Sequence, residues 1–421
     1  MATVGIVCPS APSHLYSAGS LGRELTSRGH RVILFGTSGA EPFARAAGVD
    51  FHPYGLREFS AAANAEWFAR LGRLRGTRAL REVERLLATR AAVRLAELPA
   101  AARGLGVDAL LVDQCSAEGG SIAERLDVPF MSVCSSILLN RDADVPPFNT
   151  LWHYSPSLWA RNRNRVGNWF LDCLTSTSRR VIIEQRRRWG LPHRPRQNDL
   201  HSTLAQLCQQ PEAFEFPRRH LPRCLHFTGP FQDAASRAAV DFPYERLSDQ
   251  PLVYASMGTL LTPNPEVFHC IAEACSGLDL QLVLSTGRAP IPDDLDRSVL
   301  AVQFAPQIEL LSRATLGITH AGLSSVLQCL NSAVPMVAIP VSSDQPGIAA
   351  RLQWSGAGEY VPIAQLNSKR LRKAVIRVLH DPGYREHAMR LSGAIQRAGG
   401  VARAADLVEQ VLTTGEPVFA R

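Results

Sequence analysis

Lysine, paired cysteines and long apolar runs are scarce in this chain of 421 residues, and each scarcity narrows what the protein can be. Only Lys369 and Lys373 are lysines among the 45 basic residues, and the formal net charge is +7. A GC-rich coding sequence explains this arginine bias, and attraction to phosphates, nucleotides or an anionic membrane surface is the functional alternative. No helix-turn-helix, zinc-finger or aromatic RNA-binding signature accompanies the charge, so we expect no nucleic-acid partner.

The nine cysteines are scattered from Cys8 to Cys329, without a Cys-x-x-Cys pair. Neither a disulfide framework nor a zinc site follows from that spacing, and we expect small buried side chains in a reducing compartment. The sequence also lacks a secretory signal and any uninterrupted apolar stretch long enough to span a bilayer. We therefore expect a cytoplasmic protein, and the positive charge leaves peripheral membrane association open.

Short apolar runs alternate with helix-like segments through most of the chain. Val4–Cys8 predicts a buried strand, Leu15–Arg28 a helix and Arg31–Phe35 a second strand, which together form a crossover unit of a parallel sheet. A second alternating series begins after a polar stretch. Further strands are predicted at Asp108–Asp113, Pro129–Ser135, Leu225–Pro230, Leu252–Ser256, Leu280–Ser285, Leu300–Phe304, Leu316–Thr319 and Met336–Ile339.

This organisation predicts an α/β protein with two doubly wound, Rossmann-like domains that face each other across a cleft. We expect an N-terminal, acceptor-binding domain over residues 1–233 and a linker over 234–250. A C-terminal, donor-binding domain over 251–400 and a helix over 401–421 that crosses back to the first domain would follow. Ligands of such folds bind at the carboxyl ends of the parallel strands.

One strand ends in a turn with the features of an anion site. His320 ends the strand, Gly322 allows close backbone approach, and Ser324 and Ser325 open a helix. Free N–H groups at a helix N-terminus attract anions, and the His and Ser side chains add donors for a diphosphate. An ordinary strand-to-helix turn with serine as the N-cap is the structural alternative.

Residues on both sides of this turn suit a nucleotide sugar. Phe304 could stack on a base, and the Gln307 amide could pair with the base edge. Downstream, Gln328 precedes the adjacent pair Asp344 and Gln345, which together offer the acceptors and donors that sugar hydroxyls require.

The order and spacing of these residues resemble the UDP-glycosyltransferase superfamily, glycosyltransferase family 1, which has the GT-B fold. Within it the chain looks most like bacterial carotenoid (zeaxanthin) glucosyltransferases and macrolide-type glycosyltransferases. The resemblance covers nearly the whole sequence. It is most specific in the C-terminal half, where the signature includes Phe304, Ala305, Gln307, His320, Gly322, Asp344 and Gln345.

The resemblance implies a role for each residue of the signature. Phe304 takes the place of a tryptophan that stacks on uracil, and Asp344 and Gln345 match the pair that contacts the transferred sugar. Glutamine at that position suggests glucose. The diphosphate would be held by His320, Ser324 and Ser325, with Ser256, Gly258 and Thr259 as a second phosphate-side loop.

Two positions depart from the family pattern. Gln328 stands where the family usually has a glutamate that accepts hydrogen bonds from the ribose diol, and a neutral amide accepts them without charge assistance. Ser324 replaces the commoner asparagine. The resemblance therefore leaves the donor affinity, the nucleobase and the choice of sugar open.

His14 and Asp113 are the catalytic candidates. A hydroxyl becomes a good nucleophile when its proton is removed, and histidine has the appropriate pKa for this at neutral pH. Asp113 ends a buried strand, where its carboxylate could orient the imidazole. A lone loop histidine is usually incidental and a strand-end aspartate usually caps a loop. The match to the family's general base and its partner favours the catalytic reading.

Metal chemistry has little support. Asp142 with Asp144, and Asp294 with Asp296, have the spacing of metal-binding pairs, but both lie in polar loops beside prolines and are expected to be solvated. No phosphate-binding P-loop and no His-Glu-x-x-His motif occurs. The predicted site thus contains no metal, and the UDP-sugar acts as a co-substrate, with no cofactor.

The predicted function is an inverting, metal-independent transfer of a sugar, with glucose favoured, from a UDP-sugar to a hydroxyl of a hydrophobic acceptor such as a carotenoid or another terpenoid. A nucleotide-sugar epimerase or hydrolase and a non-catalytic nucleotide-sugar binding protein are the alternatives. The aromatic and cationic segment 158–170 could shape the acceptor pocket, rest on a membrane interface, or be a surface helix with a partly buried aromatic face.

Overall fold

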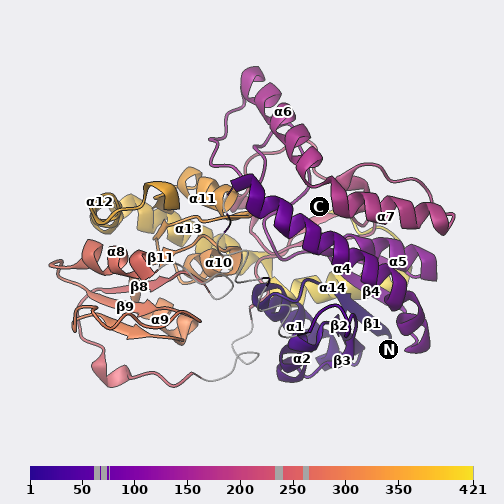
Figure 1. Ribbon diagram of the computed structural model, residues 1–421, viewed down its shortest axis with the longest axis horizontal. Helices are drawn as coiled ribbons and strands as arrows, with labels where there is room; N and C mark the ends of the chain where they lie inside the picture. The colour runs from indigo at the N-terminus through magenta and orange to yellow at the C-terminus, as the bar shows by residue number, and fades with distance from the viewer. Residues whose placement is uncertain (61–66, 68–73, 75, 233–239, 259–264, 421) are drawn as a thin grey trace.

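The computed structural model describes residues 1–60, 67, 74, 76–232, 240–258 and 265–420 (Figure 1). Two parallel sheets organise this part of the chain. The first has the strand order β3-β2-β1-β4-β5-β6-β7, and every pairing within it is parallel. Its strands are β1 (Thr3–Val7), β2 (Arg31–Gly36), β3 (Asp50–Pro53), β4 (Ala109–Asp113), β5 (Phe130–Cys134), β6 (Gln206–Cys208) and β7 (Leu225–Phe227).

The second sheet has the order β10-β9-β8-β11-β12-β13 and is also parallel. In each sheet the chain adds strands first on one side of the strand it begins with and then on the other side. This is the doubly wound arrangement predicted from the sequence. The fold class is confirmed. The strands are β8 (Leu252–Ser256), β9 (Gln281–Ser285), β10 (Leu300–Val302), β11 (Ala314–Thr319), β12 (Met336–Ala338) and β13 (Gly358–Tyr360).

Three strands escaped sequence prediction: β3, β6 and β13. Each has only three or four residues with a polar or charged residue among them, and therefore lacks the continuous apolar run that marked the others. Edge and near-edge strands of this kind are defined by their pairing partner. Their sequence alone does not distinguish them from loops.

Helices cover both faces of each sheet, as Figure 1 shows. Those of the first half are α1 (Pro12–Ser27), α2 (Glu41–Ala47), α4 (Gly76–Gly104), α5 (Glu118–Leu126), α6 (Leu158–Leu174) and α7 (Ser176–Arg188). Those of the second half are α8 (Pro265–Cys275), α9 (Gln307–Arg313), α10 (Leu323–Asn331), α11 (Gln345–Trp354), α12 (Ser368–His380), α13 (Pro382–Ala398) and α14 (Gly400–Thr414). No helix in the described ranges is long and apolar enough to cross a membrane.

The last helix leaves the second sheet and packs on the first. In Figure 1 the yellow α14 lies among the elements of the first half, and Leu407 and Val411 share a buried cluster with Leu21 and Leu25 of α1. The Arg28 guanidinium at the end of α1 donates hydrogen bonds to Asp406 and Glu409 of α14. The residues proposed as a linker, 234–250, fall partly outside the described ranges.

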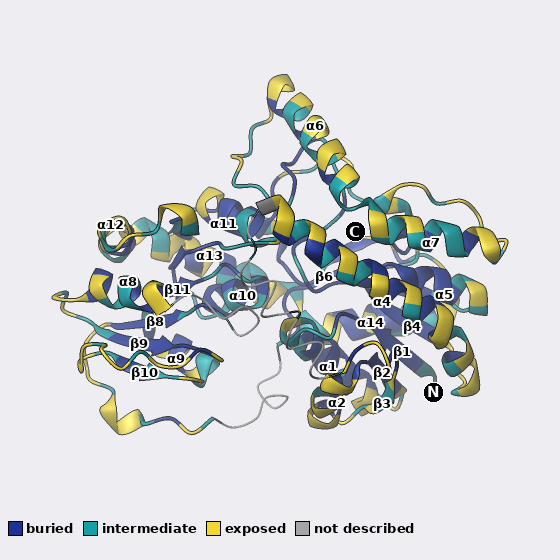
Figure 2. Cartoon of the chain, viewed as in Figure 1, coloured by how far each residue is buried: buried dark blue, intermediate teal, exposed yellow. Residues whose placement is uncertain are grey.

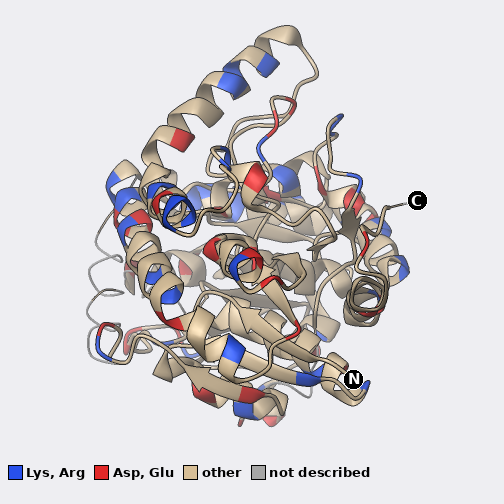
Figure 3. Ribbon diagram, turned by 90° about the vertical axis from the view of Figure 1, so that its right-hand side faces the viewer, with Lys and Arg blue, Asp and Glu red and all other residues tan. Residues whose placement is uncertain are grey.

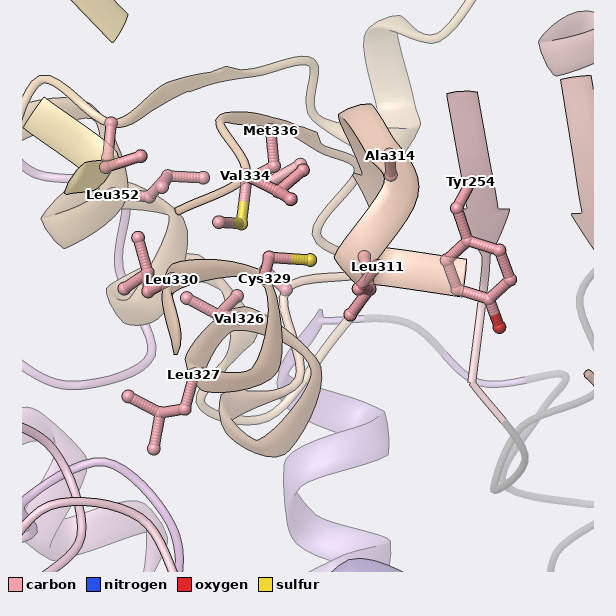
Figure 4. Close-up of a cluster of buried hydrophobic side chains, with 14 of the residues drawn as sticks. Tyr254, Leu311, Ala314, Val326, Leu327, Cys329, Leu330, Val334, Met336 and Leu352 are labelled. Carbon is pink, nitrogen blue, oxygen red and sulfur yellow. The ribbon is translucent and has the colours of Figure 1, made fainter. Parts of the chain in front are cut away.

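A buried hydrophobic cluster lies beneath α10 in the second half. Figure 4 shows Val326 and Cys329 of α10 on the same side of the helix as Met336 of β12. Leu327 and Leu330 of α10 belong to the same cluster. The same cluster contains Ile137 and Phe214 from the first half. The two halves therefore share apolar packing as well as facing each other.

Candidate active site

A cavity of about 990 Å³ lies between the halves, at the carboxyl ends of their parallel strands. The segments that follow β1, β4 and β5 line it from the first half, and those that follow β8, β11 and β12 line it from the second. This is the position at which doubly wound sheets bind ligands, because the strand order diverges there and leaves a crevice.

His14 and Asp113 meet at the first-half wall of this cavity. His14 lies in the first turn of α1, which begins at Pro12, and Asp113 is the last residue of β4. The His14 Nδ1 atom lies 2.8 Å from Asp113 Oδ2, and the Cys115 backbone N–H donates to the other carboxylate oxygen. With Nδ1 engaged, Nε2 is the imidazole nitrogen left for a substrate.

Each member of this pair changes the protonation of the other. Burial lowers the pKa of His14, but the charge of Asp113 and the hydrogen bond to it raise that pKa by more, so the net shift is upward. Burial raises the pKa of Asp113, but the charge of His14 and hydrogen bonds from His14, Cys115 and Ser135 together leave that pKa below the ordinary value. The pair is thus arranged to accept a proton on the imidazole and to balance the resulting charge.

The position beside His14 and Asp113 is also a candidate metal site. One ligand atom each from His14, Asp113 and Cys115 lies within 4.8 Å of the others. Thiolate, not thiol, is the metal-binding form of cysteine, and burial together with the Asp113 charge raises the pKa of Cys115 well above its usual value. The 2.8 Å contact already engages His14 Nδ1 and one Asp113 oxygen with each other, and this favours a hydrogen-bonded His–Asp pair.

His320 is enclosed by backbone on the opposite wall. A Cβ atom added at Gly258 would lie 2.6 Å from His320 Cε1, and one added at Gly322 would lie 2.5 Å from its Nε2. Burial lowers the pKa of His320 to about 4, so the ring is neutral at pH 7. Its buried Nδ1 has no hydrogen-bond partner among the described residues.

Ser324 and Ser325 follow in the first turn of α10 and line the same cavity, as do Ser256 and Gly258 after β8. Uncharged hydrogen-bond donors and the N-terminus of α10 therefore lie together on the second-half wall of the cavity. Thr259, which was predicted to belong to this group, lies outside the described residues.

Asp344 and Gln345 begin α11 and face the first half. The Ser136 hydroxyl, just after β5, donates to Asp344 Oδ2 at 2.5 Å, so the carboxylate contacts the opposite domain. Gln345 Oε1 accepts from the backbone N–H groups of Val341 and Ser342 at 2.8 and 3.1 Å. That oxygen is occupied, and only the amide N–H₂ group of Gln345 remains to donate to a ligand.

The residues predicted to contact the nucleobase and its ribose divide into two groups. Gln307 and Gln328 line the cavity, and the Gln307 amide donates to Gln328 Oε1 at 2.6 Å. Phe304, by contrast, is 46% exposed in the loop between β10 and α9, and Ala305 packs against the core beneath α10. In the described part of the chain neither Phe304 nor Ala305 lines the cavity.

Ser136 and Arg90 are among the polar cavity residues that were missed from sequence. Ser136 follows β5, and the rule that parallel strands end at one edge of the sheet could have identified it. Arg90 lies on α4, is 5% exposed and lines the cavity, and no sequence motif marks it. Its buried Nε atom has no hydrogen-bond partner among the described residues.

One of the two acidic pairs was misread. Asp294 is solvated as expected, but Asp144 is buried, 3.0 Å from Arg161, and accepts a hydrogen bond from the Arg219 backbone at 3.0 Å. The prolines beside it do not mark a solvated loop here, because α6 supplies Arg161 and covers this segment. Asp144 acts as a structural anchor for that helix.

The two facing sheets and the cleft between them define a glycosyltransferase of the GT-B class. The chain belongs to the family described as UDP-glucoronosyl and UDP-glucosyl transferase, which matches residues 164–398. It is 32% identical to a zeaxanthin glucosyltransferase of Pantoea ananas over 100% of this chain and 98% of the relative. It is 26% identical to a 4'-demethylrebeccamycin synthase of Lentzea aerocolonigenes, over 97% of this chain and 99% of the relative.

Solved structures agree on the fold. The crystal structure of the calicheamicin glycosyltransferase superposes with a TM-score of 0.75 at 22% identity, covering 99% of this chain and 100% of that one. The glycosyltransferase of kitacinnamycin gives the same TM-score and identity. These comparisons confirm the family and the GT-B fold that the sequence motifs predicted.

Proposed function

We propose that this glycosyltransferase moves glucose from UDP-glucose to a hydroxyl of a lipophilic acceptor, with inversion at the anomeric carbon and without a metal ion. The observation that carries the proposal is the placement of the His14–Asp113 pair and the Asp344–Gln345 pair on the two walls of one cavity. This placement supports a direct displacement, in which a base on one wall and a group that holds the sugar on the other would face each other.

In this mechanism His14 Nε2 removes the acceptor proton while the acceptor oxygen attacks the anomeric carbon. The bond from that carbon to the UDP oxygen breaks, and the diphosphate leaves toward the first turn of α10 and the neutral His320. Asp113 orients the imidazole and stabilises the imidazolium. Positioned donors around the diphosphate stabilise the developing charge without any metal.

The lipophilic acceptor is inferred from the first-half wall. Leu80, Val83 and Leu87 lie along one stripe of α4, and with Ile182 of α7 and Phe148 they line the cavity. Such a wall suits a long apolar molecule whose hydroxyl reaches His14. The zeaxanthin glucosyltransferase relatives support a carotenoid or another terpenoid. A molecule of this kind resides in membranes, so the proposal includes peripheral contact with a lipid surface.

The carboxylates on the acceptor side argue against the epimerase or hydrolase alternative. Glu84 accepts hydrogen bonds from the backbone and side chain of Ser178, and Glu118 is paired with Arg94 at 2.6 Å. Both groups are occupied in structural contacts. Neither is free to serve as the second acid or base that those reactions would require.

A direct assay tests the proposal. The protein is incubated with UDP-glucose and a panel of hydroxylated carotenoids, terpenoids and flavonoids in the presence of EDTA, and UDP release is measured. We expect acceptor-dependent release and a β-glucoside product by NMR. His14→Ala should reduce kcat by roughly 10²- to 10⁴-fold, and His153→Ala, which removes an exposed histidine, should not.

Retention of acceptor-dependent turnover in His14→Ala would contradict the mechanism. Tight UDP binding with no turnover on any acceptor would instead favour a non-catalytic nucleotide-sugar binding protein.

A further inference from the structure

Helix α6 projects from the body of the molecule and turns apolar side chains to solvent. Figure 1 shows it standing clear of both sheets, and Figure 2 shows exposed segments along its outer side. The exposed fractions of Trp159 and Trp169 are 71% and 66%. We call the following set the α6 face: Leu158, Trp159, Val166, Trp169 and Phe170, all of them more than half exposed.

The α6 face occupies one side of the helix, with the exposed polar Asn162 among its apolar side chains. At about 100° per residue, its five side chains fall within about 120° of the helix circumference. The buried residues Ala160, Asn164 and Leu171 lie on the opposite side and pack toward the body. The helix is therefore amphipathic with its small and polar side inward and its large apolar side outward. Exposed patches of this kind mark contact surfaces.

Arginines border the α6 face on both edges. Arg165 follows one edge, and Arg163 follows the other, where its guanidinium lies over the rings of Trp152 and Trp159 at 4.9 and 5.4 Å. Arg161 is paired with the buried Asp144 and is not among these cations. Figure 3 shows the basic segments along this helix. The one acidic residue of α6, Asp172, is engaged by Arg141 and Arg179.

A lipid surface fits this chemistry better than a second copy of the chain. Tryptophan and phenylalanine insert at the boundary of headgroups and acyl chains, and adjacent arginines attract anionic headgroups. A second copy would bring the same arginine borders together without acidic partners. The helix is also too short and too polar on its inner side to cross a membrane.

The base of α6 adjoins the acceptor side of the cavity. Thr175, which ends α6, lines the cavity, and so do Ser178 and Ile182 of the next helix and Phe148 before it. A surface bound by the α6 face therefore lies next to the apolar wall along α4.

We propose that the α6 face docks this protein on an anionic lipid bilayer, by inserting its aromatic side chains in the plane of the interface. The further claim, that the lipophilic acceptor passes from that bilayer into the cavity, rests on the proposed function. Docking itself does not depend on catalysis.

The test is co-sedimentation with phosphatidylcholine vesicles that contain or lack phosphatidylglycerol. We expect the full chain to bind phosphatidylglycerol vesicles, more weakly as salt is raised. Trp159→Ser/Trp169→Ser/Phe170→Ser should weaken this binding by at least roughly tenfold. The matched control is Ile291→Ser/Met389→Ser/Phe419→Ser, which removes three exposed apolar side chains elsewhere and should bind as the wild type does.

Wild-type binding by the α6 triple variant, or no wild-type binding to either vesicle, would overturn the proposal. A wild-type dimer in size-exclusion chromatography that becomes monomeric in the triple variant would assign the face to a second copy instead. Transfer to a short, water-soluble acceptor without vesicles separates the two hypotheses. The triple variant should retain it. A wild type that binds vesicles but releases no UDP with any acceptor of the panel would refute only the proposed function.

Discussion

At the scale of single residues, the site is governed by the charges around His14. Burial lowers its pKa, Asp113 and Asp344 raise it, and Arg90 lowers it from the acceptor side of the cavity. Asp113 prevails because it also holds the imidazole by a hydrogen bond at 2.8 Å. In the proposed mechanism the imidazole must be neutral to act as a base, so we expect catalysis to be lost as the pH falls through this pKa.

Arg90→Met should therefore move the acidic limb of the kcat/KM profile to higher pH. The positive charge of Arg90 disfavours the imidazolium, and its removal raises the pKa of His14. The measurement is kcat/KM against pH for acceptor glucosylation.

Arg90→Lys keeps the charge and should leave the limb near its original position. Arg85→Met, which removes an exposed arginine of the same helix, should leave it there as well. A limb that is unmoved in Arg90→Met would show that Arg90 does not act on the base.

At the scale of secondary-structure elements, two loop glycines define the pocket around His320. The turn after β8 and the turn after β11 approach so closely that neither Gly258 nor Gly322 has room for a side chain. Gly258 also has φ of +78°, in the left-handed region that favours glycine. The two elements thereby fix the neutral imidazole beside the N-terminus of α10.

Gly258→Ala should displace His320 and weaken the binding of UDP. The added Cβ would lie 2.6 Å from the ring, a clash of the kind that costs about 1–3 kcal/mol beyond the backbone strain. Calorimetric titration with UDP and thermal unfolding measure the two effects.

Gly277→Ala is the matched control, since Gly277 has φ of +67° and a Cβ added there would meet no atom within 4 Å. The Gly277→Ala variant has the backbone strain without the steric clash and should bind UDP as tightly as the wild type does. Equal UDP affinity in the two variants would refute the role assigned to this contact.

At the scale of the whole molecule, the halves are joined by a buried ionic cluster as well as by apolar packing. Glu215 of the first half lies 2.6 Å from Arg351 of α11 and 3.3 Å from Arg218, and all three side chains are almost fully buried. Gly347 of α11 approaches the backbone of Phe148 so closely that a Cβ would lie 2.0 Å from its carbonyl oxygen. The cleft is thus closed at one end by direct contact between the halves.

Glu215→Gln should destabilise the protein by about 3–5 kcal/mol, because it leaves two buried guanidinium groups without their carboxylate. Urea unfolding followed by fluorescence measures the loss. Glu41→Gln breaks an exposed pair with Arg45 and should change stability little. Equal losses of unfolding free energy in both variants would show that the buried cluster joins the halves no more strongly than an exposed ion pair would.

The sequence by itself determined the fold class, the position of most strands and the family. These depend on local patterns: apolar runs of strand length, helical periodicity between them, and residues whose order and spacing match the family signature. It also singled out His14 and Asp113, and the structure places these residues in hydrogen-bond contact across 99 positions of sequence.

Tertiary structure decided what local pattern leaves open. Arg90 lines the cavity, Ser136 contacts Asp344, and Asp144 is buried beside Arg161. Each of these contacts joins segments that lie far apart in the chain, so no local spacing in the sequence predicts it. Helix α6 is the clearest case. An amphipathic pattern states that one side of a helix is apolar, but only the packing of the rest of the chain decides whether that side faces the core or the solvent.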